Sequence, residues 1–61
     1  MAIEIMSTEE FAAYIRRPVA TIRYWRHIGK GPKSARIGSR VAYRRSDVEA
    51  WLNEQFEQAA G

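Results

Sequence analysis

Apolar residues recur at helical spacing in three stretches of the chain, and the first of these begins after Ser7. Ser7 and Glu10 have the spacing of a capping box, which marks the start of a helix. Met6 and Phe11 occupy the flanking positions of a hydrophobic staple. Pro18 marks the end of this helix or the first turn of the next, because proline is excluded from a helix interior. The apolar face of the first helix consists of Phe11, Ala12 and Ile15.

A second helix is predicted from about residue 18 to about residue 28, and Gly29 suits its left-handed C-terminal cap. One face of this helix is apolar and comprises Val19, Ile22 and Trp25. The opposite face comprises Ala20, Arg23, Tyr24 and His27. Arg26 lies near the apolar side, where its stem would cover the core while its head reaches solvent. Two short helices separated by about three residues make a helix-turn-helix candidate.

A loop at residues 29–32 precedes two alternating stretches, residues 35–37 and 40–44, which predict a β-hairpin. Gly38 followed by Ser39 suits a two-residue type II′ turn between them. We expect the inward side chains to be Ile37, Val41 and Tyr43. We expect the outward side chains to be Arg36, Arg40 and Arg44. Like charges across a hairpin are destabilising, so this arrangement is more favourable if phosphates neutralise the arginines.

A third helix is predicted to begin at a second capping box, Ser46 and Glu49, with Asp47 adding favourable charge near its positive end. Its apolar stripe consists of Val48, Trp51, Leu52 and Phe56. Its opposite face carries Glu49, Asn53, Glu54 and Glu57. This helix is therefore expected to brace the fold and to turn its acidic face away from any polyanion. The sequence leaves open whether Ile3 and Ile5 add a short strand to the wing.

Together these elements predict an α+β fold, a small winged helix-turn-helix. It consists of a helix-turn-helix, a two-stranded β-hairpin wing and a C-terminal bracing helix. We expect one domain over residues 1–61, with its core at about residues 6–57. The chain has no cysteine and 46% hydrophobic residues. Stability must therefore come from a compact core without disulfides, near the lower size limit for independent folding.

Charge is segregated along the chain. All 10 Lys and Arg residues lie between Arg16 and Arg45, whereas the 7 carboxylates lie outside that block. The net charge of +3 is therefore the sum of a strongly positive central half and negatively charged flanks. Such a field attracts a polyanion, and duplex DNA is the densest common one. The block is interleaved with Tyr24, Trp25 and Tyr43, and it predicts nucleic-acid binding rather than a solvated basic surface.

The sequence offers little support for catalysis, for a metal or for a membrane segment. A nucleophile–base pair would need His27, and no carboxylate lies nearby in sequence to orient it. One histidine without cysteine cannot build a zinc site. We therefore expect no catalytic residue, no metal and no cofactor. No apolar run approaches the ~18 residues of a membrane span, and Glu4 stands where a signal peptide would be basic and then apolar. A cytoplasmic protein is expected.

Three segments, residues 7–12, 20–32 and 36–52, resemble the MerR-like winged-helix domains of phage excisionases and AlpA-type regulators. The match covers about residues 6–53. In that family the second helix enters the major groove, and the wing touches flanking backbone or the minor groove. The resemblance implies an excisionase that binds double-stranded DNA beside a phage attachment site in the host cytoplasm, bends it and directs an integrase towards excision. A small phage transcriptional regulator with the same fold is the alternative.

The resemblance also implies individual DNA contacts, with Arg23 either reading guanine or clamping a phosphate. Tyr24 is expected to donate to a phosphate, and Arg40, beside the hairpin tip, to probe the minor groove or backbone. Trp25 and Trp51 are expected to be core. The complete set of candidate DNA-binding residues is Arg16, Arg17, Ala20, Thr21, Arg23, Tyr24, His27, Lys30, Lys33, Arg36, Arg40 and Arg44. Thr21 lies off the centre of the exposed face, so it would contact a phosphate or cap the helix.

The chain departs from the family at the turn, where Arg16 and Arg17 replace a usual glycine and small apolar residue. A non-glycine residue in the left-handed region costs roughly 1 kcal/mol or more, which favours another path for this turn. We expect both side chains to point outward.

The expected assembly is a monomer in solution that binds DNA beside neighbouring copies, because the chain after Ser46 is too short for the long dimerisation helix of full MerR regulators. A phage integrase is a further candidate partner. A different class of function is a protein-interaction module whose basic face meets an acidic partner. RNA binding is less favoured, because no exposed aromatic pair suggests base stacking.

Overall fold

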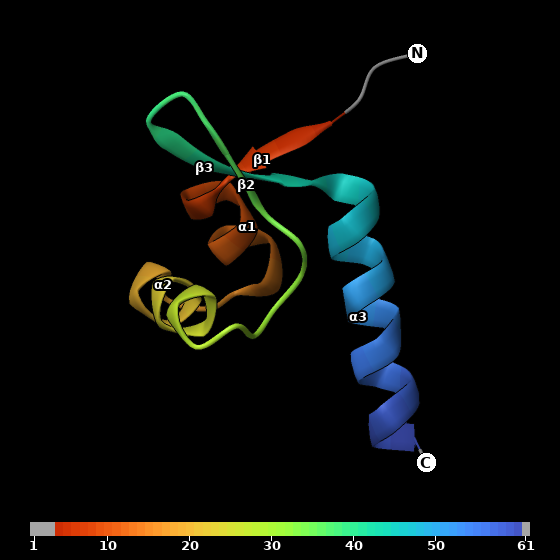
Figure 1. Cartoon of the computed structure of the whole chain (residues 1–61). Helices are drawn as coiled ribbons and strands as arrows, with labels where there is room; N and C mark the ends of the chain where they lie inside the picture. The colour runs from red at the N-terminus through yellow and green to blue at the C-terminus, as the bar shows by residue number, and fades with distance from the viewer. Residues whose placement is uncertain (1–3, 61) are drawn as a thin grey trace.

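The first helix and the beginning of the third helix pack against a small antiparallel sheet, and the second helix packs against the first (Figure 1). This computed structural model describes residues 4–60. Its elements in chain order are β1 (Ile5–Ser7), α1 (Thr8–Ile15), α2 (Val19–His27), β2 (Ala35–Ile37), β3 (Arg40–Arg44) and α3 (Arg45–Ala60). The architecture is the α+β winged helix-turn-helix that the sequence predicts.

The sheet has three strands in the order β1-β3-β2, so the wing has one strand more than the predicted two-stranded hairpin. β1 pairs antiparallel with β3, and Met6 lies opposite Tyr43. Ile5 therefore belongs to a strand, whereas Ile3 lies outside the described residues. The hairpin turn has Gly38 at a φ of 64°, and Ser39 has no positive φ, in agreement with the predicted type II′ turn.

The predicted orientation of the wing side chains is wrong for Ile37 and Arg36. Ile37 pairs with Arg40 and Arg36 pairs with Val41, and residues opposite each other in a ladder share a face. Because Val41 packs against the core, Arg36 lies on the core-facing side of the sheet and Ile37 on the outer side. Ile37 is accordingly 60% exposed. The two-residue turn fixes this register, whereas alternation read separately in each strand does not.

An aromatic cluster forms the centre of the core. The ring centroid of Phe11 lies 4.7 Å from that of Tyr43 and 5.9 Å from that of Trp51. Trp25 and Trp51 are 5.7 Å apart, so the second and third helices meet at this pair. Both tryptophans are half-buried against the core, as predicted. The fully buried or nearly buried core residues are Met6, Phe11, Ala12, Ile22, Tyr43 and Val48.

Only the first half of α3 packs on the core. Val48 is fully buried and Trp51 and Leu52 are half-buried, but Phe56 is 71% exposed. The prediction that Phe56 belongs to the core stripe is therefore wrong. α3 continues past the other helices and leaves no partner for its last turns among the described residues (Figure 1). Helical periodicity identifies a face of a helix but not how far the rest of the protein extends along it.

The helix starts differ in how well the sequence predicts them. Ser7 and Glu10 form the expected capping box, with the Ser7 N–H donating to Glu10 Oε1 at 2.8 Å and the Glu10 N–H donating to Ser7 Oγ at 3.0 Å. The second expected box does not form, because α3 already begins at Arg45 and places Ser46 inside its first turn. Glu49 instead accepts a hydrogen bond from Arg45 Nε at 3.0 Å.

The turn between α1 and α2 keeps a left-handed residue despite having no glycine there. Arg16 has φ 60° and ψ 47°, so the expectation that the turn takes another path is wrong. The Arg16 N–H donates to the Ala13 carbonyl at 3.2 Å and the Arg17 N–H to the Ala12 carbonyl at 2.9 Å. These bonds satisfy the terminal carbonyls of α1, which offsets the backbone strain. Both arginine side chains are exposed, as expected.

Arg16→Gly is expected to stabilise the protein by about 0.5–1 kcal/mol. Glycine has no Cβ to crowd the left-handed region, and this gain exceeds the extra entropy that it gives to the unfolded chain. The measurement is the urea midpoint at unchanged m value. Arg17→Gly is the matched control, since it removes the same charge at a residue without positive φ. Equal midpoints for the two variants would contradict the assignment of strain to Arg16.

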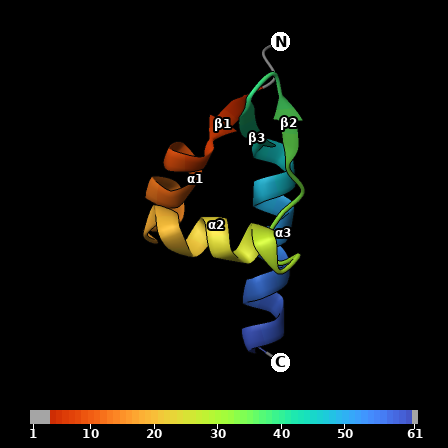
Figure 2. The same cartoon turned by 60° about the vertical axis from the view of Figure 1, so that its left-hand side comes forward.

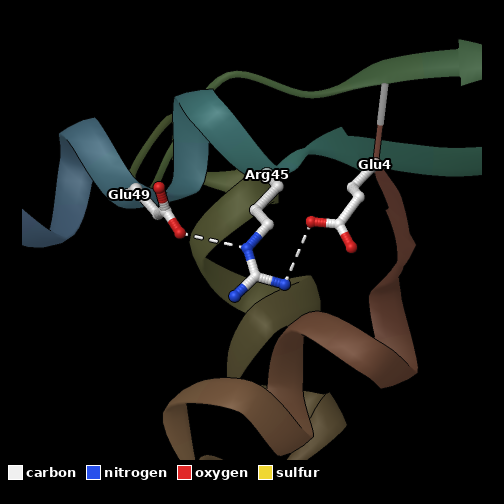
Figure 3. A network of polar contacts seen from close by, with 3 residues as sticks. All are labelled: Glu4, Arg45 and Glu49. Carbon is white, nitrogen blue, oxygen red and sulfur yellow. Dashed lines mark hydrogen bonds and ion pairs between the residues drawn. The ribbon is translucent and has the colours of Figure 1, made fainter. Parts of the chain in front are cut away.

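An ion-pair network ties the N-terminal segment to the start of α3 (Figure 3). Arg45 Nη1 lies 3.1 Å from Glu4 Oε1, and Arg45 Nε lies 3.0 Å from Glu49 Oε2. The backbone N–H of Arg45 also donates to the Glu4 carbonyl at 3.0 Å. The guanidinium of Arg45 lies over the ring of Tyr14. The hydrogen bond to Glu49 and then the charge of Glu4 raise the pKa of Arg45. Arg45 therefore holds parts of the fold together rather than standing free.

Stability is expected to fall as the pH rises above about 10. Burial raises the pKa of the Tyr43 phenol, and the nearby charge of Arg26 offsets part of this effect. In the unfolded chain a tyrosine ionises near pH 10, so at higher pH the unfolded state gains a favourable ionisation that the folded state resists. Below about pH 10 the stability that depends on a neutral Tyr43 phenol is fully present. This stability is lost progressively as the pH rises from about 10 to the raised pKa of Tyr43. Urea midpoints at about pH 8 and pH 11 measure it. Tyr43→Phe is expected to flatten the loss.

Candidate nucleic-acid interface

The exposed face of α2 has the composition that the sequence predicts. Ile22 is buried and Val19 and Trp25 are half-buried, so the helix is anchored by one side. The side chains on the other side are all exposed and are Ala20, Arg23, Tyr24 and His27. Thr21 is half-buried at the border between them. It does not cap the helix, because the N-cap residue that precedes α2 is Pro18 and no side chain makes a capping hydrogen bond there.

The wing tip lies on the same side of the molecule as α2, and α3 lies on the other side (Figure 1). The view in Figure 2 shows α2 crossing the molecule in front of α3, below the sheet. Arg40, on the strand that leaves the hairpin tip, and Arg23 of α2 line one surface depression of about 210 Å³. The remaining lining residues are Ser7, Thr8, Glu9 and Val41. The fold thus brings the two principal candidate arginines, distant in sequence, to one place.

Arg23 has an acidic neighbour in this depression that the sequence did not predict. Its Nη2 atom lies 3.8 Å from Glu9 Oε2, and both side chains are largely exposed. Glu9 belongs to the first turn of α1, where a carboxylate is favoured by the helix dipole. Spacing within one helix gives no signal for this contact, because it depends on how α1 and α2 pack together.

Arg36 is exposed on the core-facing side of the sheet, opposite Val41, which itself lines the depression with Arg23. Its corrected orientation therefore directs it to the side of the sheet that carries the helices. Arg26 donates from Nε to Ser34 Oγ at 3.3 Å. This bond fastens the loop after α2 to the helix, so that Arg26 has a structural partner of its own.

Three of the predicted cations lie away from the depression that joins Arg23 and Arg40. Lys33 and Arg44 line a larger depression of about 410 Å³ on the outer face of the sheet, and Arg44 Nε lies 3.0 Å from Asp47 Oδ2. Lys30 lines another depression with Trp25, Trp51 and Gln55. The structure therefore does not gather all predicted basic residues into one surface, and the charge of Arg44 is already offset by a carboxylate.

The acidic residues of α3 are exposed on the other side of the molecule from α2 and the wing tip. Glu49, Glu54 and Glu57 are all exposed, in agreement with the predicted solvent face. α3, which carries them, leaves the core and projects past it (Figure 1). The charges are therefore not fully separated into a basic and an acidic side, since Arg45 pairs with Glu49 and Lys33 lines one depression with Glu54.

The fold and the exposed basic second helix define a helix-turn-helix protein. A family model described as a helix-turn-helix domain matches residues 5–55, and the chain belongs to this family, which includes AlpA-like and excisionase-like DNA-binding proteins. The domain implies DNA as the partner. Neither a curated protein nor a solved structure shows significant similarity to the chain.

In residues 4–60 no group of three or more His, Cys, Asp or Glu side chains is placed to hold a metal ion. Over the same range, no helix is both long enough and apolar enough to cross a membrane.

Proposed function

We propose that this protein is an excisionase, a sequence-specific binder of double-stranded DNA that acts beside a phage attachment site. The observation that carries the proposal is the meeting of Arg23 from α2 with Arg40 from the wing in one exposed depression. A helix that enters the major groove and a wing that reaches the adjacent groove or backbone need this juxtaposition. The exposed carboxylates of Glu54 and Glu57 belong to α3, which projects away from α2 and the wing tip, and this favours an orientation in which α2 and the wing face DNA.

In this proposal the protein performs no chemistry and acts by shaping DNA in the host cytoplasm. Two contacts from different parts of one small rigid domain favour duplexes that bend to meet both, and a bend brings the sites of an integrase together. The proposed assembly is a monomer in solution and adjacent copies on DNA. The exposed Phe56 within an acidic helix and the apolar outer sheet face bordered by Lys33 are complementary surfaces for such neighbours.

The test is to mix the protein with sheared DNA from its source genome, recover bound fragments at moderate salt and sequence them. Short repeats flanking an attachment core are expected. Repeats that overlap a promoter instead would overturn the excisionase assignment in favour of a transcriptional regulator with the same fold. Fragments with no enrichment over input would remove sequence-specific DNA binding altogether and favour an acidic protein partner for the basic face.

A further inference from the structure

Glu9 is set apart from the other carboxylates near the first helix by what it contacts. Glu10 is held by the capping box, and Glu4 is held by Arg45. Glu9 instead points to α2, where its Oε2 atom lies 3.8 Å from Arg23 Nη2. It also lines the depression that contains Arg40. A negative charge thus stands among the cations of the proposed DNA-binding surface, where a surface built only for phosphate would have none.

The position of Glu9 in the first turn of α1 is favourable for the helix dipole, but that does not account for its side-chain contact. The first turn already has Glu10, whose carboxylate completes the cap. The exposed pair with Arg23 adds little stability, since water screens ion pairs of this kind. A gain in stability therefore does not account for the pair.

We infer that Glu9 is a specificity-determining residue, which acts with Arg23 to select a G·C base pair and to disfavour phosphate in this depression. The inference rests on the proposed DNA-binding function. A guanidinium donates to O6 and N7 of guanine, and a carboxylate accepts from N4 of cytosine. These guanine and cytosine groups lie side by side in the major groove of one base pair. Arg23 and Glu9 present the complementary donors and acceptor side by side.

For a phosphate, the same depression is less favourable because it contains a negative charge. The phosphate is attracted by Arg23 and Arg40 but repelled by Glu9, so the depression binds it less well than two arginines alone would. Specificity is the difference between the affinities for correct and incorrect DNA, and a repulsive element increases that difference. Glu9 thus lowers the affinity of the protein for DNA of random sequence. It also favours contact of Arg23 with a base edge over contact with a phosphate.

The experiment compares Glu9→Gln with wild type on a random-sequence duplex library, with sequencing of the bound fraction and titration of the unselected library. Glu9→Gln is expected to bind the unselected library about two- to fivefold more tightly, the scale of an exposed charge interaction. It is also expected to lose the preference for G·C at one position of the selected motif. Glu10→Gln is the matched control, because it removes the same charge one residue away and glutamine still completes a capping box.

A second comparison tests whether Glu9 acts through Arg23. In an Arg23→Ala background, Glu9→Gln is expected to leave the selected motif unchanged, since the partner of the carboxylate is gone. The inference is overturned if Glu9→Gln and Glu10→Gln have the same affinity and select the wild-type motif. A wild-type protein that selects no motif would instead refute sequence-specific binding itself, so the two failures are distinguishable. Thermal unfolding verifies that each variant is folded.

Discussion

Phe11→Ala is expected to leave the protein largely unfolded at 25 °C. The Phe11 side chain is 1% exposed and contacts the rings of Tyr43 and Trp51, so it joins α1, the sheet and α3. Truncation of a buried phenylalanine costs about 3–5 kcal/mol. A core of this size rarely supplies more than about 3–5 kcal/mol of net stability. The loss therefore equals the whole stability of the fold, and far-UV circular dichroism with urea titration measures it.

Phe56→Ala is the matched control for this prediction. It removes the same atoms from a side chain that is 71% exposed, and a change of less than about 0.5 kcal/mol is expected. Similar losses for the two variants would mean that the last turns of α3 pack on the protein, contrary to the structure. A Phe11→Ala variant that keeps the wild-type urea midpoint would place the core elsewhere.

Arg23→Ala is expected to weaken binding to the selected DNA site by about 1–3 kcal/mol and to relax one position of that site. The side chain is largely exposed on the face of α2 opposite the core, so its removal leaves packing intact. Fluorescence anisotropy on the selected site and on an unrelated duplex measures both affinities. A loss of equal size on the unrelated duplex would make Arg23 a phosphate clamp instead of a base reader.

Two other arginines provide the comparison for Arg23. Arg40→Ala is expected to weaken binding to every sequence and to reduce the salt dependence, because its expected contact is the backbone or the minor groove. Arg44→Ala is expected to have a smaller effect, since Asp47 already offsets its charge on the outer face of the sheet. A larger loss for Arg44→Ala than for Arg40→Ala would move the proposed interface from the depression at Arg23 to the depression that Arg44 lines with Lys33.

The sequence predicted most of the fold because its local signals agree with one another. The box at Ser7 and Glu10, the αL glycine at Gly29 and the Gly38-Ser39 turn each depend on neighbouring residues alone. Two local predictions were wrong, the capping box at Ser46 and the path of the turn at Arg16, and two further errors depended on longer-range geometry. The face of Ile37 was fixed by its partner Arg40 across the turn, and the exposure of Phe56 by the length of its helix relative to the core.

The candidate site was predicted in its parts but not as an arrangement. The exposed face of α2 follows from helical periodicity, which correctly separates Arg23 and Tyr24 from Ile22. The meeting of Arg23 with Arg40 depends on the angle between α2 and the sheet, which no spacing along the chain reveals. The contact of Glu9 with Arg23 could not be predicted for the same reason, because it depends on how α1 and α2 pack together. A block of charge that is continuous in sequence also need not be continuous on the surface, as Lys30 and Lys33 demonstrate.

Ser7 is both the last residue of β1, paired with Ala42 of the wing, and the cap of the first helix. One residue thus couples the wing to the helix-turn-helix, and neither part has a free linker along which to shift. In the proposed complex, the separation between the two DNA contacts would be set by the protein, and the duplex would change its shape to meet both. Bases that the protein never touches are then selected for how readily they bend, so the binding site is expected to be longer than its footprint of direct contacts.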